Sequence, residues 1–213
     1  MKESLLQLKI KAVVFDCDGV MFDSTEANTA FYNAILAHMG RAPMSAEDFS
    51  FAHMATADQT MLRLFPDPRD HDRAQAFRKK LGYNGFIGLM KMEPTLRPLL
   101  SMIRPGYRTA VATNRSDTMG RVLEDHKLAD LFDCVVTALD VPRAKPFPDP
   151  IEKVLEIFKI GAEEAVYIGD TKMDELASRA AGVPFVAYRN PGLSADFHVE
   201  ALSQVTEVLT RLG

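Results

Sequence analysis

The 213-residue sequence has few cysteines, no long hydrophobic run and no excess of positive charge. Its two cysteines, Cys17 and Cys134, do not have the spacing of a zinc site or a disulfide framework. No hydrophobic run approaches the length of a membrane-spanning helix, and residues 1–6 are too short and too polar for a signal peptide. We therefore expect a cytoplasmic protein that does not bind a membrane.

The balance of charge excludes a further class of partner. A net charge of −4 argues against a surface that binds nucleic acid or anionic lipid. It does not exclude a small phosphorylated ligand, because a bound cation can offset local negative charge. With 47% hydrophobic and 25% charged residues, the chain resembles an ordinary globular protein of one or two domains. We expect a monomer, with a dimer as the alternative.

The stretch from residue 11 to residue 24 carries the strongest local signal. The hydrophobic run from Ala12 to Phe15 predicts a strand that is buried on both faces. Asp16, Asp18 and Gly19 follow it, and alternation along a strand sets the two aspartates on the same side. Two carboxylates that close repel each other, so this strand end requires either a bound cation or a shared proton.

The second half of the chain alternates between strand and helix patterns. Strands are predicted at residues 108–113, 134–137, 165–169 and 185–188. Helices are predicted near residues 95–104, 116–126, 150–159, 173–181 and 199–211, with Asp149 as the cap before Pro150 in the third of them. This alternation predicts an α/β fold, a Rossmann-like parallel sheet of five strands with helices on both faces.

More than eighty residues separate the first predicted strand from the second. A single crossover helix needs only about a dozen residues, so this segment is too long to be a connection. Its patterns predict helices after Thr25 and Ser45 and near residues 56–65, 70–81 and 84–91, without a convincing strand. We therefore expect an α/β core domain of residues 1–21 and 94–213, and a helical cap domain of residues 22–93 over the carboxyl end of the first strand.

Polar residues, and one glycine, follow four of the predicted strands. They are Asp16, Asp18 and Gly19 after the first strand, Thr113 and Asn114 after the second, Lys145 after the third, and Asp170 and Asp174 after the fourth. The carboxyl ends of parallel strands share one edge of the sheet, which is where ligands bind in such folds. The sequence therefore predicts that these residues meet at one site.

In this order, the four motifs resemble those of the haloacid dehalogenase-like hydrolase superfamily. The nearest branch is that of phosphoglycolate phosphatase and β-phosphoglucomutase, which carries a helical cap after the first motif. The resemblance implies a sheet order of 3-2-1-4-5, so that the first and fourth strands are neighbours. One departure is Pro94-Thr95, where relatives often have Pro-Gly before the return helix.

The resemblance also implies roles for the motif residues. Asp16 would attack phosphorus and form an aspartyl phosphate, and Asp18 would act as general acid and then as general base. Thr113, Asn114 and Gly19 would hold phosphoryl oxygens, and Lys145 would neutralise negative charge. These assignments predict a small phosphorylated metabolite as the substrate.

A divalent cation completes the implied site. The Asp16 carboxylate, the Asp18 backbone carbonyl and Asp170 would hold it, with Asp174 acting directly or through water. Hard oxygen ligands and the low number of histidines favour Mg²⁺ over zinc.

Each of these residues also has a simpler interpretation. Asp16 and Asp18 could cap a turn or bind Ca²⁺, although Val20 stands where an EF-hand has a ligand. Thr113 could be a buried hydroxyl, Lys145 a surface lysine and Asp170 a helix cap. Arg115 could contact substrate or lie exposed at a helix start, and His53 is the histidine most suited to face a substrate from the cap.

Four functions compete. The first is a Mg²⁺-dependent phosphatase of a small phosphomonoester, similar to phosphoglycolate phosphatase, and its alternative is a phosphomutase of the β-phosphoglucomutase type. A 2-haloacid dehalogenase is disfavoured because those enzymes use no metal and lack the second aspartate, which is present here as Asp18. A non-catalytic binding protein is disfavoured because neither the Asp16 nor the Lys145 position is eroded.

Overall fold

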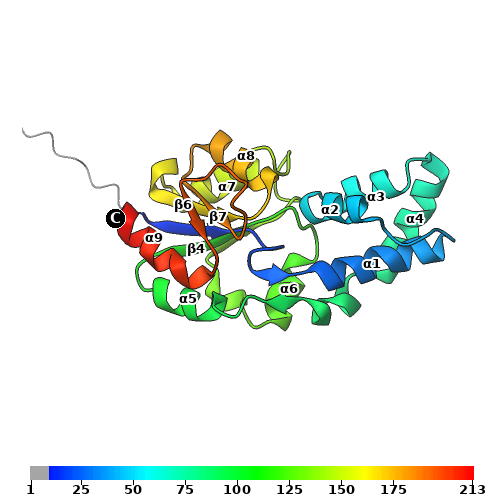
Figure 1. Cartoon of the computed structure of the whole chain (residues 1–213), viewed down its shortest axis with the longest axis horizontal. Helices are drawn as coiled ribbons and strands as arrows, with labels where there is room; N and C mark the ends of the chain where they lie inside the picture. The colour runs from blue at the N-terminus through cyan, green and yellow to red at the C-terminus, as the bar shows by residue number, and fades with distance from the viewer. Residues whose placement is uncertain (1–9) are drawn as a thin grey trace, which may run out of the picture.

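The computed structural model describes residues 10–213 (Figure 1). Residues 1–9 of the expected core domain, and the prediction that no signal peptide begins the chain, lie outside the described residues. No helix within residues 10–213 is long and hydrophobic enough to cross a membrane.

A six-stranded parallel sheet forms the centre of one part of the molecule, in the order β5-β4-β1-β6-β7-β8. Its strands are β1 (Ala12–Phe15), β4 (Arg108–Ala112), β5 (Cys134–Val136), β6 (Ala165–Gly169), β7 (Phe185–Tyr188) and β8 (Phe197–Val199). The predicted order of the first five strands is confirmed. The sheet has a sixth strand that was not predicted, because the three residues of β8 are too few to show an alternating pattern.

Helices cover both faces of the sheet (Figure 1). On one face lie α5 (Leu96–Ile103), α6 (Met119–Asp125) and α9 (Val205–Leu212), and on the other lie α7 (Asp149–Phe158) and α8 (Lys172–Ala181). Short 3-10 turns complete this part: η2 (Ala129–Leu131), η3 (Ala162–Glu164) and η4 (Leu202–Gln204). Along β1, Val13 and Phe15 belong to the first hydrophobic cluster and Ala12 and Val14 to the second, as expected for a strand buried on both faces.

The segment between β1 and α5 is almost entirely helical. It contains α1 (Thr25–His38), α2 (Ala46–Met54), α3 (Ala57–Leu64), α4 (Pro68–Leu81) and the 3-10 helix η1 (Asn84–Leu89). Two short strands, β2 (Phe22–Asp23) and β3 (Lys91–Met92), pair antiparallel where this segment leaves and rejoins the core. No strand was predicted here, because two residues carry no pattern. We propose residues 22–93 as the cap domain and call this segment the cap.

The local sequence explains where the cap helices begin. The Ser45 hydroxyl accepts the N–H of Asp48 and the Asp48 side chain accepts the N–H of Ser45, so α2 starts with a capping box. Thr56 and Gln59 form the same arrangement at α3. Two predictions in the core were wrong at helix starts. Pro148, not Asp149, caps α7, and the helix expected from residue 199 begins at Val205 because β8 and η4 occupy the residues before it.

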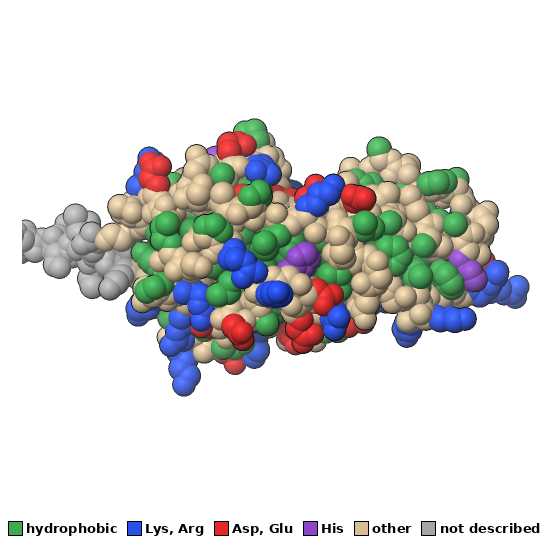
Figure 2. All heavy atoms as spheres, turned by 90° about the horizontal axis from the view of Figure 1, so that it is seen from below, with side chains coloured by type: hydrophobic (Ala, Val, Ile, Leu, Met, Phe, Trp, Pro, Cys, Tyr) green, Lys and Arg blue, Asp and Glu red, His purple; other side chains and the backbone are tan. Residues whose placement is uncertain are grey.

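The cap and the core share hydrophobic contacts. One cluster of buried side chains includes Leu99 and Val111 in the core together with Ile35 and Phe65 in the cap. In the view of Figure 2, a notch separates the two parts, and charged side chains of both signs gather along it. The fold therefore sets the cap against the carboxyl edge of the sheet, where the candidate residues lie.

Candidate active site

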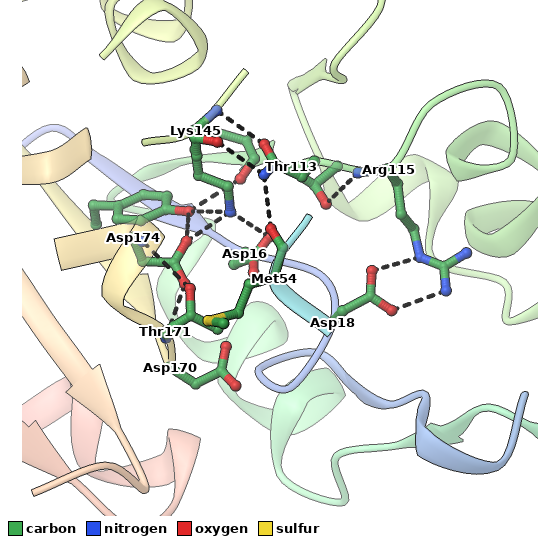
Figure 3. Close-up of polar contacts among 12 residues, drawn as sticks. Asp16, Asp18, Met54, Thr113, Arg115, Lys145, Asp170, Thr171 and Asp174 are labelled. Carbon is green, nitrogen blue, oxygen red and sulfur yellow. Dashed lines mark hydrogen bonds and ion pairs between the residues drawn. The ribbon is translucent and has the colours of Figure 1, made fainter. Parts of the chain in front are cut away.

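The residues singled out from the sequence meet at the carboxyl ends of β1, β4 and β6 (Figure 3). Asp16, Asp18, Thr113, Asn114, Arg115 and Lys145 line one pocket between core and cap. Asp170 lines an adjoining pocket together with Gly19, and His53 lines both. Asp174 joins them, with a carboxylate oxygen within 4.8 Å of those of Asp16 and Asp170, so the structure brings together all nine residues that the sequence proposed for the site.

Lys145 lies at the centre of a buried group that we call the Lys145 cluster: Lys145, Asp16, Asp174 and Tyr167. Its ammonium nitrogen is 2.8 Å from Asp16 Oδ1 and 2.6 Å from Asp174 Oδ1. The Lys145 side chain is 2% exposed, so the interpretation as a surface lysine is wrong. Lys145 Nζ also donates to the Tyr167 hydroxyl at 2.9 Å. Tyr167 was not predicted from the sequence, because its only signal is a hydroxyl within the hydrophobic strand β6.

The charges of this cluster depend on one another. Burial by itself lowers the pKa of Lys145, but the carboxylates of Asp16 and Asp174 outweigh burial and raise that pKa above its ordinary value. Burial raises the pKa of Asp16 to about 7, Lys145 opposes the rise, and Asp174 and Asp170 add to it. Lys145 is therefore a fixed cation beside a carboxyl group that needs further positive charge to ionise fully.

Asp174 is fully occupied by protein donors. Its Oδ1 accepts hydrogen bonds from Lys145 and from the Tyr167 hydroxyl, and its Oδ2 accepts them from the N–H and the hydroxyl of Thr171. Burial favours the neutral form, but Lys145 and these hydrogen bonds hold the pKa of Asp174 below its ordinary value. We therefore expect Asp174 to position Lys145, and to act on a metal indirectly more than as a direct ligand.

Asp170 has a different environment. Its Oδ1 is buried and has no hydrogen-bond donor, and its Oδ2 lies 3.1 Å from Nε2 of His53 in the cap. Burial raises the pKa of Asp170, while the hydrogen bond with His53 lowers it. That hydrogen bond outweighs burial and raises the pKa of His53 to about 9. Asp170 thus offers an oxygen that no group of the described chain satisfies.

Gly19 makes room for Asp170. Its φ of +85° favours glycine, and a Cβ at this position would lie 2.0 Å from Asp170 Oδ2. The N–H of Gly19 donates to the carbonyl of Phe22 at 2.8 Å, so it is not available to a phosphoryl oxygen. The prediction that Gly19 binds phosphate is corrected here: Gly19 allows the close approach of Asp170.

The residues present fit a divalent cation. Asp16, Asp170 and Asp174 each offer a carboxylate oxygen, and these oxygens lie within 4.8 Å of one another. Asp16 Oδ1, like Asp170 Oδ1, is buried without a hydrogen-bond donor, because its contact with Lys145 is an ion pair without hydrogen-bond geometry. Hard oxygen donors of this kind suit Mg²⁺. A cation here would also stabilise the ionised form of Asp16.

Asp18 belongs to a second group, the Arg115 cluster: Arg115, Asp18, Tyr83, Asn28 and Ser24. Arg115 Nε donates to Asp18 Oδ2 at 2.8 Å and Nη2 donates to Oδ1 at 2.9 Å, a bidentate pair. Burial favours the neutral carboxyl group, but Arg115 and then Ser24 hold the pKa of Asp18 below its ordinary value. Figure 3 shows Asp18 turned toward Arg115 and away from the Lys145 cluster.

The cap contributes to the Arg115 cluster. The Tyr83 hydroxyl lies 3.1 Å from Arg115 Nη2, and the Tyr83 ring lies 4.7 Å from the guanidinium carbon. Tyr83 then donates to Asn28 Oδ1 at 2.6 Å, and the Asn28 amide donates to the Ser24 hydroxyl at 3.2 Å. Arg115, 7% exposed in its side chain, is therefore not an exposed residue at a helix start.

Thr113 and Asn114 connect the two clusters. The Thr113 hydroxyl accepts the N–H of Arg115 at 3.1 Å. The Asn114 side chain accepts the N–H of Lys145 and donates to the carbonyls of Lys145 and, across the cap boundary, Met54. Within residues 10–213 the backbone N–H of Asn114 has no acceptor, so it is free to bind a ligand oxygen.

Comparison with known proteins identifies relatives of this arrangement. The model of the family described as haloacid dehalogenase-like hydrolase matches residues 13–188. A putative pyrophosphatase, PpaX, of Caldanaerobacter subterraneus is 30% identical over 200 residues, which cover 85% of this chain and 83% of that protein. A phosphoglycolate phosphatase of Neisseria meningitidis is 27% identical over 186 residues, which cover 81% of this chain and 77% of that protein.

Solved structures agree with this match. A haloacid dehalogenase-superfamily hydrolase of subfamily IA from Geobacter sulfurreducens has a TM-score of 0.79 and 41% identity, covering 94% of this chain and 97% of that one. A β-phosphoglucomutase from Clostridium difficile has a TM-score of 0.82, covering 95% of this chain and 98% of that one. At 17% identity, the second likeness shows the fold alone.

Proposed function

The chain belongs to the haloacid dehalogenase-like hydrolase family, and we propose that it is a Mg²⁺-dependent phosphatase that hydrolyses a small phosphomonoester through an aspartyl phosphate at Asp16. One observation carries the proposal. Asp16 is a buried carboxyl group at the wall of the pocket, 2.8 Å from the ammonium of Lys145 and beside the unsatisfied oxygen of Asp170. Fixed positive charge next to a carboxylate suits attack on an anionic phosphoryl group.

The first step forms the covalent intermediate. A carboxylate oxygen of Asp16 attacks phosphorus, and the bond between phosphorus and the ester oxygen breaks. Asp18, which takes up a proton from water once it leaves Arg115, gives that proton to the departing oxygen, so the alcohol leaves neutral. The ammonium of Lys145, the Thr113 hydroxyl and the free N–H of Asn114 are suited to hold the phosphoryl oxygens during this transfer.

The second step regenerates the enzyme. A water molecule attacks phosphorus, Asp18 accepts the proton of that water, and the bond between phosphorus and Asp16 breaks. Inorganic phosphate forms, and Asp18 releases the proton to water when it returns as a carboxylate to Arg115.

The proposed cation site consists of the Asp16 carboxylate, the Asp18 backbone carbonyl and Asp170, with Asp174 acting through Lys145. When bound there, Mg²⁺ would offset the negative charge that otherwise keeps a carboxylate away from a phosphate. Asp170 can occupy its position in this site because Gly19 has no side chain.

The test is phosphate release from a panel of phosphomonoesters that includes p-nitrophenyl phosphate and phosphoglycolate. Each ester is assayed with Mg²⁺, with EDTA and with the Asp16→Asn variant, and Asp130→Asn, an exposed aspartate, is the matched control. We expect release that needs both Mg²⁺ and Asp16 and is unchanged in Asp130→Asn.

Two other results would change the assignment. Activity that survives Asp16→Asn would exclude the proposed nucleophile. The absence of Mg²⁺-dependent release from every ester would exclude a general phosphatase and favour the phosphomutase, which is then assayed on hexose phosphates.

A further inference from the structure

Arg115 is a buried cation in the wall of the active-site pocket, and all of its side-chain nitrogens are engaged. Nε and Nη2 bind Asp18, Nη2 also contacts the Tyr83 hydroxyl, and Nη1 donates to the Thr118 hydroxyl at 3.2 Å. Asp18 is its only carboxylate partner among the described residues. Charge compensation of Arg115 therefore depends on Asp18.

This pairing conflicts with the role proposed for Asp18. Both oxygens of Asp18 are bound to Arg115, so the carboxyl group must leave at least one of these contacts to reach an ester oxygen. If Asp18 turned away alone, it would leave a guanidinium that is 7% exposed without a counter-charge. Removing one partner of a buried ion pair is strongly unfavourable, so another anion has to take its place.

We propose that the substrate supplies this anion: its leaving group carries a second anionic group, a carboxylate or a phosphate, which replaces Asp18 on Arg115. Asp18, freed from the guanidinium, takes up a proton from water and delivers it to the ester oxygen. The inference rests on the proposed phosphatase function and deepens it, because it assigns Arg115 as the residue that selects the substrate class. A neutral leaving group would leave Asp18 on Arg115, and turnover would be slow even where the phosphoryl group binds.

The surroundings of Arg115 suit such an exchange. The guanidinium is held in place by the Tyr83 ring at 4.7 Å and by Thr118, neither of which has to move when Asp18 leaves. The planar fork of an arginine binds carboxylate and phosphate groups in two-point fashion, as it binds Asp18 here. Arg78 of the cap, whose side chain is 17% exposed, lines the same pocket and pairs with Asp58 at 2.8 Å.

The experiment compares matched leaving groups. Phosphoglycolate is compared with 2-hydroxyethyl phosphate, which has a neutral hydroxyl in place of the carboxylate, and pyrophosphate represents a phosphate leaving group. Each is assayed with wild-type protein, with Arg115→Gln, and with Arg121→Gln as the control, since Arg121 is an exposed arginine of α6 whose side chain is 56% exposed.

We expect the wild-type protein to prefer an anionic leaving group over 2-hydroxyethyl phosphate. In Arg115→Gln, kcat/KM for the preferred anionic substrate should fall about 100-fold, so that the preference over 2-hydroxyethyl phosphate is lost. If the loss is larger for phosphoglycolate, the anionic group that binds Arg115 is a carboxylate. If the loss is larger for pyrophosphate, that group is a phosphate. Arg121→Gln should match the wild type on all three.

Two results would overturn the inference. One is a wild-type protein that hydrolyses 2-hydroxyethyl phosphate as fast as both anionic substrates, a comparison that does not depend on whether a variant folds. The other is an equal loss on charged and neutral substrates in Arg115→Gln, which would mean a general structural role. Hydrolysis of p-nitrophenyl phosphate that requires Asp16 would show that the phosphatase function holds even when the inference on Arg115 fails.

Discussion

The site contains two cation–carboxylate clusters that differ in how they are built. The Lys145 cluster comes from the core alone, and its lysine side chain is 2% exposed between two carboxylates. The Arg115 cluster joins the core to the cap, because Tyr83 and Asn28 of the inserted segment complete it. The first is therefore preorganised by the sheet, while the second depends on the position of the cap.

This difference separates two tasks of a phosphatase. Handling the phosphoryl group needs fixed positive charge, which the Lys145 cluster supplies from residues of the core alone. Handling the leaving group needs an acid–base residue that can change its hydrogen-bond partners. Asp18 is held by Arg115, which also contacts Tyr83 of the cap. The predictions below test whether the two clusters act independently.

The largest effect is expected from Lys145→Met. Asp16 and Asp174 would remain buried without their cation, so we expect kcat to fall at least about 100- to 1,000-fold on every substrate. The free energy of unfolding should fall by about 3–5 kcal/mol, measured by urea denaturation. Lys80→Met, at an exposed lysine of α4, is the control and should stay within about 0.5 kcal/mol of the wild type. A kcat within ten-fold of the wild type would mean that Lys145 has no catalytic role.

A second prediction concerns Asp170→Asn, which removes the charge of the carboxylate whose Oδ1 has no donor. We expect Mg²⁺ to raise the melting temperature of the wild-type protein, because an ion that binds only the folded state stabilises it. Asp170→Asn should need at least about 10-fold more Mg²⁺ for the same rise. Thermal unfolding at a series of Mg²⁺ concentrations measures the rise in melting temperature and the Mg²⁺ concentration that it requires. Asp130→Asn is the control. Identical titrations for wild type and variant would place the cation elsewhere.

A smaller effect is expected from Tyr83→Phe. The ring over Arg115 remains, but the hydroxyl that links Arg115 to Asn28 is lost, leaving Asn28 Oδ1 without that donor. The free energy of unfolding should fall by about 1–3 kcal/mol. The Mg²⁺ titration of the melting temperature should keep its midpoint, because Tyr83 does not belong to the Lys145 cluster. If that midpoint moves as far as in Asp170→Asn, the two clusters are not independent. Tyr107→Phe, a tyrosine of the core, is the control.

The smallest effect is expected from Ser45→Ala, which removes the capping hydroxyl of α2 in the cap. We expect a loss of about 1 kcal/mol in the free energy of unfolding and a kcat for p-nitrophenyl phosphate within about two-fold of the wild type. Ser50→Ala in the same helix is the matched control, since its hydroxyl bonds only the carbonyl of Ala46. A large loss of kcat in Ser45→Ala alone would show that the core cluster also depends on the cap.

The sequence predicted the sheet well because its central strands are continuous hydrophobic runs that end in distinctive polar residues. The run from Ala12 to Phe15 leads directly to Asp16, and both the strand and its neighbours in the sheet are where they were expected. Strands β2, β3 and β8 were not predicted, because two or three residues cannot show a period. The domain boundaries at residues 22 and 93 remain a proposal.

The partners of the site residues were harder to predict than the residues themselves. A motif shows that Lys145 and Asp170 share one edge of the sheet, since topology fixes that. It does not show that Tyr167 bonds Lys145, or that His53 reaches Asp170 from 117 residues away, because those contacts depend on how helices pack in three dimensions. The pairing of Arg115 with Asp18 was missed for the same reason.

The end of α2 contacts the core at two adjacent residues. His53 meets Asp170 at 3.1 Å, and the carbonyl of Met54 accepts the Asn114 amide at 2.9 Å. Movement of the cap away from the sheet would break both contacts at once, and in many enzymes such an opening step precedes product release. If product release limits turnover here, the number of turnovers per second would depend on the strength of these two hydrogen bonds rather than on the chemistry at phosphorus.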